Sequence, residues 1–208
     1  MSVKTILVSQ PKPESEKSPY FDLAEKYNLK IDFRPFINVE GVSTREFREQ
    51  KVDLAKQTAV IFTSKTAVDH FFRIADETRF KVPDAMKYFC MSEAVAYYLQ
   101  KYVVYRKRKI FFGRQNINDL IDVLKKHKNE KFLLPCSDIL RARIPNTLKE
   151  NNITFEKLVL YRTVASDLSD LEDVKYDVLV FFSPSGIESL LKNFPDFKQK
   201  GTRIAAFG

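Results

Sequence analysis

Two serines lie where an apolar run gives way to a helical pattern, and both have the chemistry to bind an anion. Ser64 follows the run at 59–63, and Ser183 follows the run at 177–182. A serine at a helix start is a favoured N-cap, because its hydroxyl accepts a hydrogen bond from an amide of the first turn. The other free N–H groups and the positive end of the helix dipole attract carboxylates and phosphates. The sequence leaves capping and anion binding open for each serine.

The segments around these serines resemble each other. Residues 60–68 align without a gap with residues 179–187, through strand, turn and helix. All βα units share an apolar strand and an amphipathic helix, so a generic match is one interpretation. Because the register is kept throughout, we favour two related α/β lobes. Pro184 and Gly186 are typical of a helix start that a ligand can approach closely.

Three further places carry side chains suited to a site. Ser92 follows another apolar run, and Glu93 beside it favours capping, because its carboxylate repels an anionic ligand. Ser137 and Asp138 are interpreted as the cap of a later helix. Tyr161 ends a predicted strand, where tyrosine is a common strand former. Its hydroxyl can also donate a hydrogen bond or a proton in a cleft.

The charge balance favours an anionic partner. The chain has 35 Lys and Arg against 27 Asp and Glu, a net charge of +8. Basic clusters at 106–109 and 125–131 have the composition to bind nucleic acid, but they are more typical of solvated turns and helix ends. No RRM, KH or helix-turn-helix pattern accompanies them.

Scarce residue types exclude several classes of site. The five glycines form neither a G-x-G-x-x-G turn nor a P-loop, which excludes the common nucleotide cradles. The two cysteines and two histidines lack metal-ligand spacing and give little support to covalent catalysis. We expect reduced thiols in a cytoplasmic protein, without a leader peptide or a membrane span.

The elements that must position these side chains alternate along the chain. Most apolar runs are nearly continuous, which is typical of parallel strands buried on both faces. Apolar residues recur at helical spacing between them, as in Val68, Phe71, Phe72 and Ala75. The pattern predicts βαβ units. We expect strands at 4–9, 31–36, 59–63, 87–91, 109–112, 131–135, 155–161, 177–182 and 203–207.

Four segments together resemble the uroporphyrinogen-III synthase family. They are residues 61–64, 133–137, 160–164 and 181–186, and their order and spacing fit the family along essentially the whole chain. Members of this family convert hydroxymethylbilane, a linear tetrapyrrole with carboxylate groups on every ring, to cyclic uroporphyrinogen III. The reaction removes water and inverts ring D, and it uses no metal or other cofactor.

The resemblance implies an α/β fold of two lobes, each a mostly parallel β-sheet flanked by helices, joined by a two-stranded connection. One lobe would be discontinuous, formed by residues 1–36 plus 165–208, and the lobe of residues 37–164 would be inserted into it. The crossing strands would be 31–36 and about 158–164, and the substrate would lie in the cleft between the lobes. The first lobe would continue beyond Gly208 with another helix.

The resemblance also implies roles for individual residues. Tyr161 would assist the departure of the substrate hydroxyl, as the catalytic residue of a cofactor-independent hydro-lyase. The enzyme would be monomeric and would bind neither membrane nor nucleic acid. The implied substrate-binding residues lie mainly at the two junctions and are Thr63, Ser64, Lys65, Ser92, Ser183, Pro184, Ser185, Gly186 and Arg203.

Two other functions compete with the synthase. Gln10, Met91 and Ala94 depart from residues that are common in the family. These departures motivate a catalytically weak or inactive two-lobed binding protein of the same fold. The third choice is a basic nucleic-acid-binding protein that uses 106–109 and 125–131.

Overall fold

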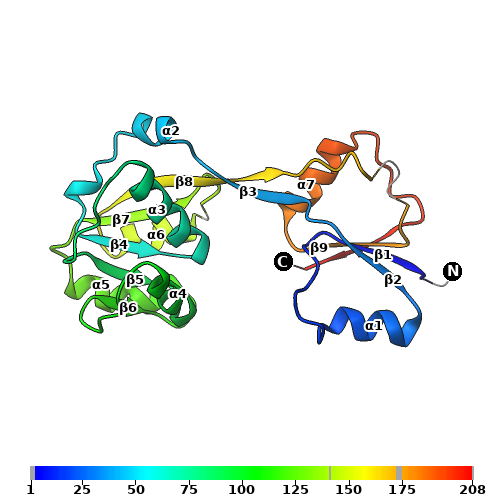
Figure 1. Cartoon of the computed structure of the whole chain (residues 1–208), viewed down its shortest axis with the longest axis horizontal. Helices are drawn as coiled ribbons and strands as arrows, with labels where there is room; N and C mark the ends of the chain where they lie inside the picture. Colours follow the sequence, from blue (N-terminus) through cyan, green and yellow to red (C-terminus); the bar gives the residue numbers. More distant parts are fainter. Residues whose placement is uncertain (1–2, 141, 172–174, 208) are drawn as a thin grey trace. The chain divides into compact units, whose positions relative to one another are not determined.

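The chain divides into two compact units in a computed structural model that describes residues 3–140, 142–171 and 175–207. Unit 1 comprises Met1–Val39 and Thr163–Gly208, and unit 2 comprises Glu40–Arg162. Figure 1 shows the order of the elements along the chain.

Unit 2 is built on a sheet in the order β3-β8-β7-β4-β5-β6, in which the neighbours from β8 to β6 are parallel. Its strands are β3 (Ile37–Gly41), β4 (Ala59–Phe62), β5 (Lys87–Cys90), β6 (Ile110–Phe112), β7 (Phe132–Ser137) and β8 (Phe155–Ala165). Its α-helices are α2 (Thr44–Glu49), α3 (Lys65–Glu77), α4 (Glu93–Tyr98), α5 (Ile121–Lys126) and α6 (Arg143–Glu150). Short 3-10 turns cover Leu54–Lys56, Leu99–Lys101 and Ile117–Leu120.

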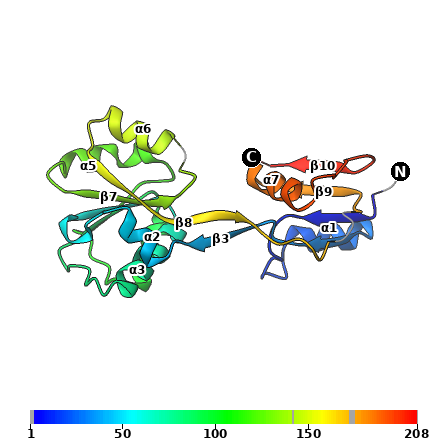
Figure 2. The same ribbon diagram turned by 90° about the horizontal axis from the view of Figure 1, so that it is seen from above.

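Both faces of this sheet are covered, as the continuous apolar runs require. Along β4, Val60 and Phe62 pack with residues of α3 and α4, whereas Ala59 and Ile61 pack with residues of α5 and α6. Figure 2 shows α5 and α6 on one side of β7 and α3 on the other. The two apolar layers hold β4 in the middle of the unit, so the turn that follows it is rigidly supported.

Unit 1 has a four-stranded parallel sheet in the order β10-β9-β1-β2. Its elements are β1 (Thr5–Val8), α1 (Pro19–Tyr27), β2 (Lys30–Phe33), β9 (Val178–Phe181), α7 (Pro184–Asn193) and β10 (Arg203–Ala206). Leu179 and Phe181 pack beneath α7, whereas Val180 packs on the opposite face with Tyr20 of α1. The smaller sheet therefore also has an apolar layer on each face.

The predicted parallel α/β architecture is confirmed, but the strand expected at 31–36 ends three residues earlier than predicted. The ladder of β2 ends at Phe33, and the amide of Arg34 makes one last bond to the Val8 carbonyl, at 3.0 Å. Pro35 has no N–H to continue the ladder. A separate strand, β3, begins at Ile37, and it neighbours β8 where both strands pass from one unit to the other.

None of the helices formed by the described residues has the length and apolarity of a membrane span.

Candidate active site

The candidate site of unit 2 lies where the strand order reverses. From β4 the chain continues outward to β5 and β6, and it then returns to β7 on the other side of β4. Loops that follow two such strands diverge, which leaves a crevice at the carboxyl ends of the strands. Thr63 and Ser64 follow β4 at this edge, and Ser64 is the N-cap of α3.

Ser64 makes two contacts there. Its Oγ accepts a hydrogen bond from the amide of Ala67 at 3.1 Å and lies 3.3 Å from Oη of Tyr161 on β8. A register shift between β7 and β8 pairs Ser137 with Tyr161 rather than with Leu160. Such irregularities re-aim side chains next to active sites. The shift places the phenol of Tyr161 at the start of α3.

A histidine and an arginine of α3 support the phenol. The ring of His70 stacks on that of Tyr161, with centroids 5.1 Å apart and planes 19° apart. Nε of Arg73 donates to Nδ1 of His70 at 3.2 Å, and Nη2 of Arg73 donates to the Val42 carbonyl at 2.8 Å. A Cβ at position 41 would lie within 2.9 Å of Arg73 and His70, so a larger residue would displace this pair. The backbone of Gly41 thus packs closely against both side chains.

The protonation states follow from burial. Burial raises the pKa of Tyr161, although the hydrogen bond with Ser64 opposes the shift. Burial and the charge of Arg73 lower the pKa of His70. At neutral pH the phenol therefore keeps its proton and the imidazole is uncharged. Tyr161 can donate a hydrogen bond to a ligand oxygen, whereas it is a poor base at this pH.

The candidate site of unit 1 lies at the equivalent place. The strand order of its sheet reverses between β1 and β9, and Ser9 and Ser183 follow these strands. A cavity of about 240 Å³ opens there. The residues that line it come from the ends of these strands and from the segment after β2, and they are Ser9, Gln10, Pro11, Pro35, Ile37, Phe182, Ser183 and Gly186.

The side chain of Ser183 does not cap its helix. It makes no cap hydrogen bond, although Ser183 occupies the N-cap of α7 and Pro184 follows at the first helical position. A Cβ at Gly186 would lie 3.4 Å from Phe181 and 3.7 Å from Oγ of Ser9, which are ordinary contacts. Packing therefore does not require a glycine here. The small residue instead leaves the start of α7 open to the cavity.

Other residues expected in the site lie at separate places. Lys65 begins α3, and its Nζ lies 5.4 Å from the centre of the Tyr98 ring. Ser92 caps α4 by accepting from the amide of Val95 at 3.4 Å, which confirms the capping prediction. Ser185 lies in the first turn of α7, half-buried. Arg203 starts β10, at the amino-terminal edge of the sheet, so the structure does not group it with Ser183.

The cap predicted at Ser137 and Asp138 is wrong. Ser137 is the last residue of β7, and its Oγ donates to the Ile139 carbonyl at 2.9 Å. The helix α6 begins only at Arg143, and its N-cap residue, Ala142, has no capping side chain. The polar pair terminates the strand and does not start the helix.

His70, Arg73 and Gly41 were missed by the sequence analysis. They become functional candidates only when α3 packs beside β8, and no local pattern signals that contact. The cysteines contribute no nucleophile, because burial raises the pKa of Cys90 to about 12 and that of Cys136 to about 11. Within the described residues, no group of three or more His, Cys, Asp or Glu side chains is placed to hold a metal ion.

Comparisons with known proteins agree on one family. A sequence profile of the family described as uroporphyrinogen-III synthase HemD matches residues 18–208. The fold is similar to that of a mutant uroporphyrinogen III synthase from Thermus thermophilus, with a TM-score of 0.61 and 16% identity, over 98% of this chain and 83% of that one. It is equally similar to uroporphyrinogen-III synthetase from Helicobacter pylori, with a TM-score of 0.61 and 18% identity, over 98% and 82% of the two chains. No curated protein sequence matches.

Proposed function

Because the chain belongs to the uroporphyrinogen-III synthase family, we propose that it converts hydroxymethylbilane to uroporphyrinogen III. The family acts in tetrapyrrole biosynthesis on a small-molecule substrate. In this reaction the bond from carbon to the terminal hydroxyl breaks, water leaves, and a carbon–carbon bond closes the ring with inversion of ring D. The enzyme is accordingly a hydro-lyase. We also propose that units 1 and 2 are its two lobes, and that it works as a monomer in the cytoplasm.

The arrangement around Tyr161 is the observation that carries this proposal. Its phenol lies at the carboxyl edge of the sheet, keeps its proton at neutral pH, and is held by Ser64 and His70. In the proposed mechanism Tyr161 donates a hydrogen bond to the departing hydroxyl and stabilises the negative charge that develops on that oxygen. A donor that is already oriented requires no reorganisation when the bond breaks.

The two helix starts are the proposed carboxylate sites. Free amides in the first turn of α3, beside Thr63, Ser64 and Lys65, would bind carboxylates in unit 2. The uncapped start of α7 and the cavity beside it support the same role for Ser183, Pro184, Ser185 and Gly186 in unit 1. The proposal that Ser92 and Arg203 contact the substrate rests on the family resemblance alone.

The enzyme's main task would be positioning. The linear substrate reacts largely through its own chemistry, and direct closure gives the type I isomer without inversion. A protein that holds the chain curled would favour attack by the substituted carbon of ring D, which leads to the type III isomer. This role agrees with a site that offers backbone amides and one phenol rather than a nucleophile.

The test is an isomer assay. Hydroxymethylbilane is generated enzymatically in the presence of the purified chain, the products are oxidised, and the type I and type III porphyrins are separated. We expect the type III isomer in excess, in a yield that rises with the concentration of the chain. Type I alone, in the amount seen without the chain, would overturn the synthase function and favour a binding protein of the same fold.

A further inference from the structure

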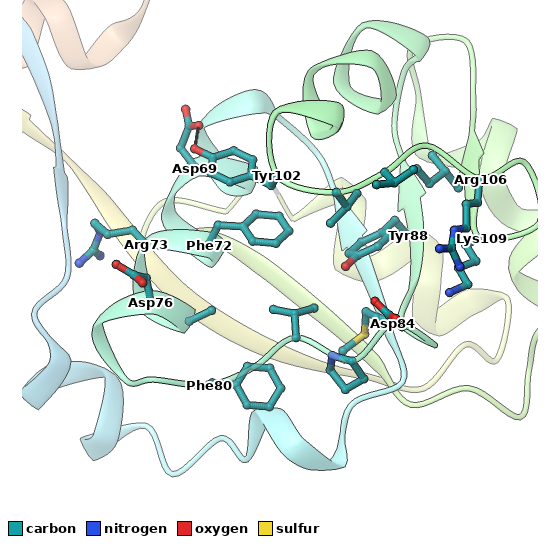
Figure 3. A pocket seen from close by; sticks show the side chains of 17 residues that line it. Asp69, Phe72, Arg73, Asp76, Phe80, Asp84, Tyr88, Tyr102, Arg106 and Lys109 are labelled. Carbon is teal, nitrogen blue, oxygen red and sulfur yellow. Dashed lines mark hydrogen bonds between the residues drawn. The ribbon is translucent and has the colours of Figure 1, made fainter.

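A second and larger cavity lies in unit 2, at the opposite edge of the sheet from Ser64. It is bounded by the second half of α3 and by the segments that lead into β5 and β6, and its volume is about 700 Å³. Figure 3 shows its lining side chains. The volume lies within the range of pockets that bind small molecules. No step of the proposed reaction uses this cavity.

Aromatic side chains form one wall. The rings of Phe72 and Tyr102 stack with centroids 4.4 Å apart and planes 2° apart. Oη of Tyr102 donates to Asp69 at 2.5 Å, and Tyr98 also donates to this carboxylate, at 2.9 Å. The wall is therefore fixed by a stack and by hydrogen bonds. Phe80 contributes a further aromatic surface, as Figure 3 shows.

Tyr88 supplies an unused polar group. Its side chain is only 4% exposed and stacks on Phe62. The hydroxyl lies on the side of Phe72 and Phe80 (Figure 3), and it has no hydrogen-bond partner among the described residues. Its oxygen is not one of the fully buried, unpaired side-chain atoms of the described residues, so it is accessible from the cavity. Burial raises its pKa, so this hydroxyl is a donor that a ligand atom can satisfy.

Two cations of the basic run lie at the same cavity. Arg106 and Lys109 are joined by a turn in which the amide of Lys109 donates to the Arg106 carbonyl at 2.8 Å, and both side chains line the cavity. Neither makes an ion pair with any residue that the structure describes. Asp69, Asp76 and Asp84 also line the cavity. Their charges oppose a ligand with several negative groups and are compatible with a single one.

We propose that this cavity binds a planar aromatic molecule with one anionic substituent. The ring lies along the wall of Phe72 and Tyr102, an acceptor atom of the ring accepts from Tyr88, and the anionic group lies beside Arg106 and Lys109. The ligand is distinct from the tetrapyrrole, because that substrate carries a carboxylate side chain on every pyrrole β-position and the cavity has three carboxylates of its own, Asp69, Asp76 and Asp84. The proposal does not depend on the synthase activity.

Isothermal titration calorimetry with two matched probes tests it on the full chain. Quinaldate is a flat ring system with an acceptor nitrogen and one carboxylate, and quinaldamide has the same rings without the charge. We expect saturable binding of one quinaldate per chain, about tenfold tighter than that of quinaldamide. The double variant Arg106→Gln, Lys109→Gln removes this difference, because the cations act only on the charge.

Tyr88→Phe should weaken both probes about fivefold, because both share the ring acceptor. Lys107→Gln is the matched control, since this neighbouring cation does not line the cavity, and it should change neither affinity. Absence of saturable quinaldate binding at millimolar concentration would overturn the proposal. Equal affinities for the two probes, or an equal loss in Lys107→Gln, would overturn it as well. If Tyr88→Phe does not fold, the charge variants still decide the outcome.

Discussion

Two strand-to-helix junctions with similar sequences behave differently in the two units. In unit 2 the hydroxyl of Ser64 is engaged twice, by the amide of Ala67 and by the phenol of Tyr161. In unit 1 the hydroxyl of Ser183 makes no cap bond and faces a small cavity. The difference arises from the neighbouring strands. Near Ser64 the long strand β8, one strand beyond β7 in the sheet, brings the phenol of Tyr161 within 3.3 Å of the serine, whereas β1, the neighbour of β9 at the reversal, ends at Val8 and is followed by Ser9.

The comparison indicates that the serine hydroxyls of the two junctions have different roles. A hydroxyl that is held in a network is suited to orient a proton donor, because its geometry is set before the ligand arrives. A hydroxyl without a protein partner is available to a ligand. Backbone amides would bind the substrate at both junctions, but we expect loss of the Ser64 hydroxyl to affect turnover and stability, and loss of the Ser183 hydroxyl to affect substrate binding alone.

Tyr161→Phe tests the chemical role of the first junction and should have the largest effect. It removes one hydroxyl and keeps the stack with His70. We expect kcat for the type III product to fall about a hundredfold, at the lower end of what one positioned proton donor contributes. The KM should change little, because the carboxylate sites remain. Tyr97→Phe is the control, since Tyr97 is 74% exposed in the same unit.

A kcat for Tyr161→Phe equal to that of the Tyr97→Phe control would remove Tyr161 from the mechanism. The two junctions would then differ in structure but not in function.

The serine pair tests these different roles directly. Ser183→Ala should raise KM about tenfold, as expected for the loss of one hydrogen bond to a charged group, with a free energy of unfolding within about 0.5 kcal/mol of the parent. Ser64→Ala should lower the free energy of unfolding by about 1 kcal/mol, because α3 loses its cap. Activity assays and denaturant titrations measure both quantities. The opposite assignment, with Ser183→Ala as the destabilising change, would contradict the comparison.

Gly186→Ala tests whether a substrate group enters the cavity beside Ser183. The new methyl group fits beside Phe181 and Ser9, and alanine favours a helix, so thermal stability should be kept or slightly increased. The same methyl group narrows the cavity of unit 1, and we expect KM to rise about threefold to fivefold, on the order of 1 kcal/mol of binding energy. Gly201→Ala is the control, because a Cβ there meets nothing within 4 Å. An unchanged KM in Gly186→Ala would show that no substrate group enters this cavity.

The uncharged state of His70 predicts a small pH effect at the first junction. Its pKa is lowered in the folded chain by burial and by Arg73, so the unfolded chain binds more protons as the pH falls below the ordinary histidine range. The folded chain keeps its full stability above that range, where His70 is uncharged in both states. It loses stability as the pH falls through the folded-state pKa of His70, because protonation favours the unfolded chain. Between about pH 7.5 and about pH 5.5, the parent should therefore lose more stability than His70→Gln. Equal losses in denaturant titrations would show that His70 is not held uncharged.

The architecture was predictable because burial on both faces of a parallel sheet leaves continuous apolar runs. The strand β3 was missed because most of its side chains are exposed. The apolar residues on both sides of Pro35 were read as one strand, so the end of β2 before this proline was not predicted. Ser64 and Ser183 were predictable as helix starts, but their different bonding was not. That difference depends on which strand lies beside each junction and on the register shift that aims Tyr161.

Amide hydrogen exchange with uroporphyrin III, a stable molecule with the carboxylates of the product, tests most directly that both junctions bind the substrate through backbone groups. We expect added protection at residues 64–67 and 185–187, since these amides begin α3 and α7. The segments around Tyr88 and Lys109, which line the second cavity, should not change. Protection confined to those segments, or absent from both helix starts, would contradict the account.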